Sequence, residues 1–185
     1  MEEAVARGPH SSAMHPHAMT QLAMEVAEKI QDNQAHLIIW DDICHNPPPN
    51  LKISPIAMIP HKSWGFRAIL DLSFHLRLSM GEHIPSVNET TTLTAPWGAI
   101  DQLGHALSCI IHAFAEADPD AAIFMAKFDI KDSFWRLVCA TGEEWKFAYV
   151  LPQPHGEPVC LVVPDSLQMG WVESPAYFCV ASETA

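Results

Sequence analysis

Apolar residues recur at helical spacing near the start of the chain. Residues 20–34 predict a helix, with Thr20 as its N-cap. Its apolar face consists of residues four apart: Leu22, Val26 and Ile30. Residues 1–19 are rich in Ala, His, Ser and Met and show no such period, so we expect them to be loose.

A second helical pattern covers residues 97–117. Its apolar stripe consists of Ile100, Leu103, Leu107, Ile110 and Phe114. Asp118-Pro119-Asp120 follows and would end the helix. We expect the stripe to pack on the sheet that carries Asp129, because an amphipathic helix has to bury its apolar face.

Alternating polar and apolar residues predict a β-hairpin between residues 53 and 72. The two strands are residues 53–59 and 66–72, and the turn between them contains Pro60 and Gly65. In the second strand one face carries the apolar residues Phe66, Ala68, Leu70 and Leu72. Residues 73–95 are polar and rich in Thr, so we expect mostly loop there.

Three further elements are predicted in the last third of the chain. Residues 122–130 form an apolar run that predicts a strand, with Asp129 near its end and a helical turn over 132–137 after it. Residues 145–151 and 159–163 predict a second hairpin. Ser174-Pro175 predicts a helix start, since Ser caps well and Pro suits the first helical position.

The charge distribution separates one basic stretch from an acidic chain. The formal net charge is −12, which is the wrong sign for a free-standing nucleic-acid binder. Between residues 51 and 78 the only acid is Asp71, against the bases Lys52, Lys62, Arg67 and Arg77. This stretch is therefore the best placed to meet a phosphate. Charged residues make up 17% of the chain, where about 25% is usual, which predicts apolar surface buried against a further element.

Cysteine usage and targeting signals bound the compartment. The five cysteines contain no Cys-x-x-Cys pair, so we expect reduced, mostly buried thiols. No signal peptide and no apolar run of membrane-spanning length is evident. We therefore expect an intracellular protein, in the cytoplasm or the nucleus, without a membrane partner.

Candidate chemistry lies in the segment Lys127-Phe128-Asp129-Ile130-Lys131-Asp132-Ser133-Phe134. A carboxylate at a strand end, such as Asp129, can offer hard oxygen ligands to Mg²⁺. Asp132 begins the following turn, where backbone N–H groups could meet a phosphate. The simpler interpretation, in which Asp129 only caps the next turn, is open at this point.

A second segment with candidate chemistry is Leu167-Gln168-Met169-Gly170-Trp171-Val172-Glu173-Ser174-Pro175. A flexible glycine at position 170 lets backbone come close to a ligand. An ordinary loop with a helix cap accounts for Ser174 and Pro175, but it gives no reason for Gly170 and Trp171 at this spacing.

Together with the basic hairpin Pro60-His61-Lys62-Ser63-Trp64-Gly65-Phe66-Arg67, these segments resemble three motifs of reverse transcriptases, in that family's order. The hairpin is similar to the fingers hairpin, the Asp129 segment to motif A, and the Gly170 segment to motif B. The resemblance departs from the family's more usual residues at His61 and at Gln168-Met169. It covers residues 51–185, and residues 1–50 form an N-terminal extension with one predicted helix and no assigned role.

The resemblance implies a role for each matching residue. Asp129 would be the catalytic metal ligand, assisted by the backbone carbonyl of Ile130. The side chain of Phe134 would exclude a 2′-hydroxyl and so select deoxynucleotides. Other nucleotide contacts are implied for Lys62, Arg67, Asp132, Ser133 and Gly170. Contacts with the template or primer are implied for Gly170, Trp171, Ser174 and Pro175.

For the whole chain the resemblance implies an α+β fold, a partial right-hand polymerase with fingers and an incomplete palm of antiparallel sheet and packed helices. The implied activity is RNA-directed DNA synthesis by a retroelement polymerase, in which a dNTP is transferred to a primer 3′-hydroxyl with two metal ions, Mg²⁺ or Mn²⁺. The partners would be an RNA template and a DNA primer.

The family's second carboxylate motif, aromatic-x-Asp-Asp, does not occur before Ala185. We therefore expect metal-dependent catalysis only in a complete polymerase and no activity from this chain alone. Two alternatives stay open: a non-catalytic nucleic-acid or protein interaction remnant with a palm-like fold, and an unrelated α/β phosphotransferase that uses Asp129 and Asp132. The oligomeric state is not indicated by the sequence.

Overall fold

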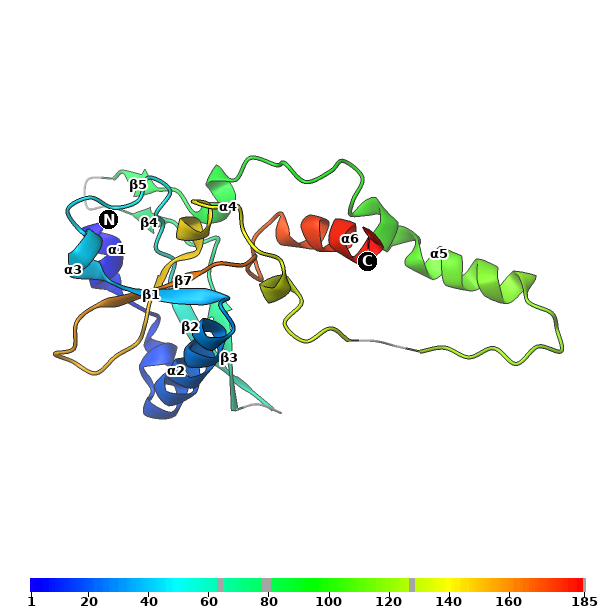
Figure 1. Ribbon diagram of the computed structural model, residues 1–185, viewed down its shortest axis with the longest axis horizontal. Helices are drawn as coiled ribbons and strands as arrows, with labels where there is room; N and C mark the ends of the chain where they lie inside the picture. The colour runs from blue at the N-terminus through cyan, green and yellow to red at the C-terminus, as the bar shows by residue number, and fades with distance from the viewer. Residues whose placement is uncertain (63–64, 78–80, 127–128, 185) are drawn as a thin grey trace.

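The computed structural model describes residues 1–62, 65–77, 81–126 and 129–184 (Figure 1). Its helices are α1 (Glu2–Arg7), α2 (Pro16–Gln31), α3 (Trp40–Ile43), α4 (Val87–Thr90), α5 (Asp101–Glu116) and α6 (Ser174–Thr184), with 3₁₀ turns η1 (Ser11–Met14), η2 (Phe134–Arg136) and η3 (Glu144–Phe147). Its strands are β1 (Ala35–Ile39), β2 (Ile56–His61), β3 (Gly65–Leu70), β4 (Leu76–Arg77), β5 (His83–Ile84), β6 (Tyr149–Val150) and β7 (Cys160–Pro164).

Helices and small antiparallel sheets share this fold, which places it in the α+β class. The described strands form a three-stranded sheet in the order β1-β7-β6 and the hairpins β2-β3 and β4-β5. In Figure 1 the sheets and α1 to α3 gather at one end of the molecule, and α5 lies at the other. No helix of the described residues is long and apolar enough to cross a membrane.

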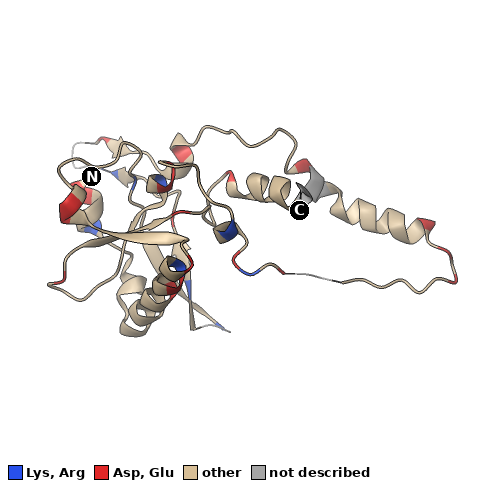
Figure 2. Ribbon diagram, in the orientation of Figure 1, with Lys and Arg blue, Asp and Glu red and all other residues tan. Residues whose placement is uncertain are grey.

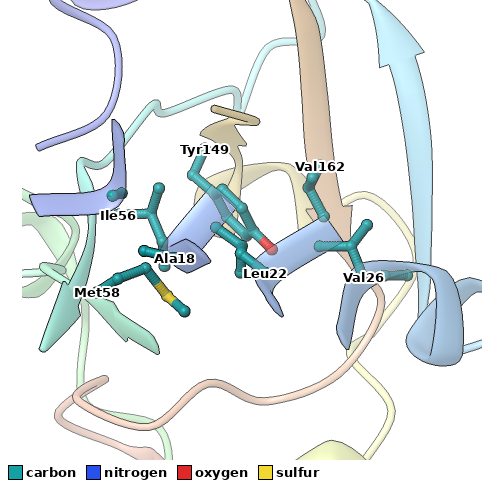
Figure 3. Packing of buried hydrophobic residues seen from close by; sticks show 9 residues of the cluster. Ala18, Leu22, Val26, Ile56, Met58, Tyr149 and Val162 are labelled. Atoms are coloured by element: carbon teal, nitrogen blue, oxygen red, sulfur yellow. The ribbon is translucent and has the colours of Figure 1, made fainter. Parts of the chain in front are cut away.

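The three-stranded sheet is covered on both faces. Figure 3 shows Leu22 and Val26 of α2 against Tyr149 and Val162 on one face. The other face carries a second core cluster, which includes Ala4, Trp40, Leu51, Ile53, Val150, Leu161 and Val163. Because side chains alternate along a strand, neighbouring β7 residues serve opposite clusters. Strand β1 comes from the first fifty residues, so this N-terminal part is built into the same core.

Helix α2 confirms the predicted apolar face but begins earlier than its period indicates. Pro16 occupies its first turn after His15, where a missing N–H costs nothing. Thr20 is therefore not the N-cap, and its hydroxyl donates to the Pro16 carbonyl inside the helix. The expectation that residues 1–19 are loose is also wrong. Buried alanines at positions 4, 13 and 18 let α1, η1 and α2 approach the core closely.

The first predicted hairpin is confirmed as β2 and β3, with shorter strands than expected. Pro60 pairs with Phe66 within it, although Pro has no N–H to donate. The Gln21 side chain of α2 accepts from the Phe66 N–H and donates to the Phe66 carbonyl. The Phe66 backbone thus points away from β2, so Pro60 sits at a pair where no ladder hydrogen bond is lost.

Helix α5 forms where predicted, but its stripe does not pack on a sheet. Ile100, Leu107, Ile110 and Phe114 are exposed, and the side chain of Leu103 lies outside the described part of the structure. Figure 1 shows the helix extending away from the sheets. The predicted strand over 122–130 is also wrong for the described part: residues 121–126 are irregular, and residues 127 and 128 lie outside the described parts of the chain. A continuous apolar run does not identify a strand unless a second strand pairs with it.

The remaining predictions are partly confirmed and partly wrong. The second hairpin is confirmed as β6 and β7, although η3 replaces the first part of the strand predicted over 145–151, and α6 begins at Ser174 as predicted. The described residues of 73–95 are mostly loop, as predicted, with the short elements β4, β5 and α4 among them. Helix α4 has a capping box formed by Ser86 and Glu89, a pattern that the sequence displays as Ser-x-x-Glu. All five cysteines are free, but only Cys179 is buried, so the expectation of mostly buried thiols is wrong.

Candidate functional site

Three segments far apart in the sequence line one cleft of about 740 Å³. The hairpin of β2 and β3 contributes His61 and Arg67, and the segment before Gly170 contributes Gln168 and Met169. The longest contribution is the run from Asp129 to Trp135, and α2 supplies further lining from the N-terminal part of the chain. The cleft therefore brings together most of the residues that the sequence analysis selected for nucleotide binding.

Asp129 lies on an irregular segment of this cleft and is exposed. Among the residues that the structure describes, none is hydrogen-bonded or ion-paired with its carboxylate. The neighbouring Ile130 also lines the cleft and is half exposed. Asp129 thus does not stand at the end of a buried strand, as the sequence suggested, but its carboxylate is open to a cation from solvent.

Asp132 lies in the same run and is already neutralised. Its carboxylate accepts from the Lys29 ammonium at 2.7 Å, and the ammonium also lies 5.1 Å from the centre of the Trp135 ring. The backbone of Asp132 has φ 56°, a left-handed conformation that Asp tolerates better than most residues. Lys29 therefore holds the turn of the candidate site in place from α2, a helix to which the sequence gave no role.

Phe134 and Ser133 follow in η2 and its preceding turn, and both are partly buried at the wall of the cleft. The Phe134 ring packs edge to face against Phe178 of α6, with ring centres 5.7 Å apart. Aromatic pairs in this geometry restrict each other's rotation. Helix α6 therefore fixes the orientation of the ring that the resemblance assigns to sugar selection.

Arg67 and Lys62, the basic residues of the hairpin, lie differently relative to the cleft. Arg67 lines it and donates to the Met169 sulfur at 2.9 Å, a contact that joins β3 to the segment before Gly170. A thioether is a weak acceptor, so a phosphate oxygen could replace it without loss. Lys62 is exposed at the hairpin turn and is not part of the lining, and residues 63 and 64 lie outside the described chain.

The loop around Gly170 is fixed by Asn88 of α4. The Asn88 amide donates to the Gly170 carbonyl at 2.9 Å and its oxygen accepts from the Val172 N–H at 3.0 Å. Gly170 itself has φ 93°, which residues with a Cβ rarely adopt. The loop thus needs glycine for its conformation. Asn88 was not predicted as a functional residue, although it lies inside the capping box of Ser86 and Glu89 that marks the helix.

Of the residues predicted to contact the template or primer, some are exposed and some are buried. Trp171 is buried, stacks on Tyr177 and donates its indole N–H to Thr91. Ser174 is fully buried, and its hydroxyl donates to the Gln168 carbonyl rather than capping α6. Gly170 and Pro175 are exposed. In this arrangement only Gly170 and Pro175 present surface that a nucleic acid could touch.

The charged side chains that line the cleft favour binding of an anion together with a cation. Two of the four acids are ion-paired, Asp132 with Lys29 and Glu28 with Lys131, and Glu25 accepts from Gln21. Asp129 and Arg67 have no oppositely charged partner among the described residues. A triphosphate bound without a cation would meet uncompensated carboxylate charge here, so the lining suits an anion accompanied by a divalent ion.

Neither a grouped set of metal ligands nor a known relative assigns a function to this cleft. Within residues 1–62, 65–77, 81–126 and 129–184 no three His, Cys, Asp or Glu side chains are grouped closely enough to hold a metal ion. Asp129 and the Ile130 carbonyl nevertheless offer oxygen donors of the type that Mg²⁺ prefers. Comparison with known protein families and with curated proteins finds no match to the chain.

Proposed function

We propose that the chain is the fingers and partial palm of a retroelement RNA-directed DNA polymerase and that its cleft takes a deoxynucleoside triphosphate with a divalent cation. The observation that carries the proposal is the meeting of three segments in one cleft. Arg67 from the hairpin, Asp129 from the motif A-like segment and Met169 from the motif B-like segment are separated by long stretches of sequence, yet all line the same space.

The residues of the cleft suit distinct parts of such a ligand. The Asp129 carboxylate and the Ile130 carbonyl would hold Mg²⁺ or Mn²⁺, and the Arg67 guanidinium offers a planar fork for the phosphate oxygens. Lys62, on the hairpin turn, would reach the outer phosphates as a mobile point charge. In a complete polymerase, a divalent ion held by these groups would lower the pKa of the primer 3′-hydroxyl and balance charge on the phosphates.

One free carboxylate is too few for catalysis by this chain alone. Mg²⁺ favours an octahedral shell and loses its waters reluctantly, and Asp132 is already paired with Lys29. We therefore expect nucleotide binding without primer extension. Primer extension by the purified chain that is lost in Asp129→Ala would contradict this expectation.

Equilibrium dialysis of a labelled dNTP tests the binding step. We expect saturable binding that requires Mg²⁺ and weakens by about tenfold in Arg67→Gln, because a charge-assisted hydrogen bond contributes roughly 1.5–3 kcal/mol. Arg77→Gln is the matched control: Arg77 belongs to the same basic stretch but does not line the cleft. Equal losses in both variants would mean that the basic stretch attracts nucleotides non-specifically, and the proposal would fail.

Phe134 gives a prediction about sugar selection. Its ring is held by Phe178, so Phe134→Ala opens space at the cleft wall. We expect the ratio of dNTP to NTP affinity to fall towards one in this variant, measured by the same dialysis. Phe178→Ala, which frees the ring without removing it, should change the ratio less. An unchanged ratio in Phe134→Ala would remove the assigned role.

A non-catalytic interaction remnant is the alternative. Asp132 is paired with Lys29, so Asp129 is the one carboxylate of its segment that has no partner in the described chain. A single available carboxylate favours a non-catalytic role. Under this alternative nucleotide binding, if any, would be indifferent to Mg²⁺ and to Asp129→Asn. The dialysis experiment separates the two functions by its metal dependence.

A further inference from the structure

Strand β1 lies at the margin of the three-stranded sheet and bonds to β7 on one side only. The direction of its backbone groups follows from the two hydrogen bonds that flank the strand. Asp165 N–H donates to the Gln34 carbonyl, and Trp40 N–H donates to the Val159 carbonyl. Both residues that bond to the β7 side, Gln34 and Trp40, have even numbers. Along an antiparallel strand, residues whose backbone bonds to the neighbouring strand alternate with residues whose backbone points away from it. The backbone groups of His36 and Ile38 therefore point towards β7.

The odd-numbered residues of β1 therefore turn their N–H and C=O groups to the open edge. Leu37 and Ile39 are the exposed members, and 43% of each remains accessible. The Leu37 N–H and C=O and the Ile39 N–H have no partner in the described chain, whereas the Ile39 C=O, at the N-cap of α3, accepts the first hydrogen bond of that helix. The contrast is Phe66 of β3, whose outward backbone is satisfied by Gln21.

This edge lacks the lysine and proline residues that often protect an open strand. Residues 35–39 are Ala-His-Leu-Ile-Ile, with no Lys, no Pro and no glycine. Exposed apolar side chains at Leu37 and Ile39 stand on the same side of the strand. Such an edge is a template for the addition of a further strand.

The charges around the edge say which kind of strand fits. Asp32 precedes β1, and Asp41 and Asp42 follow it in α3, drawn red in Figure 2. The chain has no Lys or Arg between Lys29 and Lys52 to balance them. A second copy paired antiparallel about Leu37 would set Asp42 against the copy's own Asp32, which is repulsive.

We propose that β1 is a docking edge for an extended segment of another protein that is apolar at alternate positions and carries Lys or Arg at its ends. Main-chain hydrogen bonds to Leu37 and Ile39 would hold the segment, and their side chains would cover its apolar positions. The basic ends would lie against the aspartates that flank β1. Leu37 and Ile39 do not line the cleft, although Ala35 of the same strand does, so the nucleotide proposal can fail without affecting this edge.

A short peptide of alternating Val and Thr with lysines at both ends is the probe. On titration into the full chain we expect the amides of Leu37 and Ile39 to gain protection from hydrogen exchange. The amides of His36 and Ile38, which already face β7, serve as internal controls and should change little. Protection spread equally over all four amides would mean general stabilisation and would overturn the proposal.

Two variants separate backbone pairing from charge. Leu37→Pro removes an outward N–H without touching the β7 ladder and should weaken peptide binding by about tenfold. Asp41→Asn with Asp42→Asn should weaken it by about three- to tenfold, since exposed ion pairs contribute little each. Asp118→Asn with Asp120→Asn, on the loop after α5, is the matched control and should leave binding unchanged.

Three results would overturn the proposal. The first is equal affinity for a version of the peptide with glutamates at its ends, which would reduce the interaction to apolar adhesion. The second is a peptide affinity unaffected both by Leu37→Pro and by the double substitution of Asp41 and Asp42. The third is concentration-dependent dimerisation of the chain that Leu37→Pro abolishes, because the edge would then serve a second copy.

Discussion

Asp132 shows how a single residue ties the candidate site to a helix distant in sequence. Its left-handed backbone conformation turns the segment after Asp129, and its carboxylate is held by Lys29 of α2. The Lys29 side chain is 13% exposed and that of Asp132 is 36% exposed, so the pair is only partly screened by water. The position of the whole turn therefore depends on an ion pair.

A double-mutant cycle measures this ion pair. We expect Lys29→Met and Asp132→Asn to be coupled by about 1 kcal/mol in the free energy of unfolding, measured with urea. Asn is chosen because it tolerates the left-handed conformation at position 132. Additive effects of the two substitutions would show that the contact does not stabilise the turn.

Glu89 gives α4, and through it Asn88, a dependence on pH. The pKa of Glu89 lies below its ordinary value of 4.5, chiefly because the Ser86 N–H donates to its carboxylate at 2.7 Å. A carboxyl group whose pKa is lowered by folding stabilises the folded form fully above its unfolded pKa. That contribution declines as the pH falls below 4.5 and is lost once the pH passes the lowered folded value.

We therefore expect the amide of Ser86 to lose protection from hydrogen exchange as the pH falls through this window. Glu89→Gln cannot titrate and should show a flat profile over the same range. A wild-type profile as flat as that of the variant would contradict the role given to the capping box.

At the scale of elements, α2 and α5 have similar apolar stripes and opposite environments. Leu22 of α2 is 2% exposed, whereas Leu107 of α5 is 67% exposed. We expect Leu22→Ala to cost about 2–5 kcal/mol of unfolding free energy and Leu107→Ala less than about 0.5 kcal/mol. Urea unfolding of both variants checks this. A large loss in Leu107→Ala would mean that α5 packs on the rest of the protein in solution.

The same two helices show what the sequence could and could not predict. The period of the apolar residues predicted both helices, because a stripe is a local property. The burial of the α5 stripe was predicted wrongly, since the partner of a stripe is a matter of tertiary structure. The strand over 122–130 failed for a related reason: a strand forms only where another strand can pair with it.

The candidate site was predictable in part for similar reasons. Arg67, Asp129, Phe134 and the motif B-like segment were selected from local motifs, and the structure places them around one cleft. Lys29 and Asn88 were not selected, because each acts on a segment far away in sequence. Trp171 and Ser174 were predicted to contact nucleic acid, yet their side chains are buried. No local sequence pattern distinguishes a buried residue from an exposed one in this segment.

At the scale of the whole molecule, the N-terminal fifty residues contribute to the cleft as well as to the core. Helix α2 lines the cleft and anchors Asp132, and β1 completes the sheet whose other face holds the second core cluster. At the far end, α5 has exposed apolar side chains. It carries no Lys or Arg, and no blue is seen along it in Figure 2. The chain thus has one end that carries the sheets and the candidate chemistry and one end rich in exposed apolar side chains.

The central claim is that Arg67, Asp129 and the Gly170 loop hold one metal–triphosphate ligand. Paramagnetic broadening by Mn²⁺ tests it directly in an NMR spectrum of the full chain with a dNTP. We expect the amide signals of Ile130, Arg67 and Gly170 to broaden together, and Asp129→Asn to remove the effect at all three. Broadening confined to Asp129 and its neighbours in sequence, with Arg67 and Gly170 unaffected at saturating dNTP, would contradict the claim.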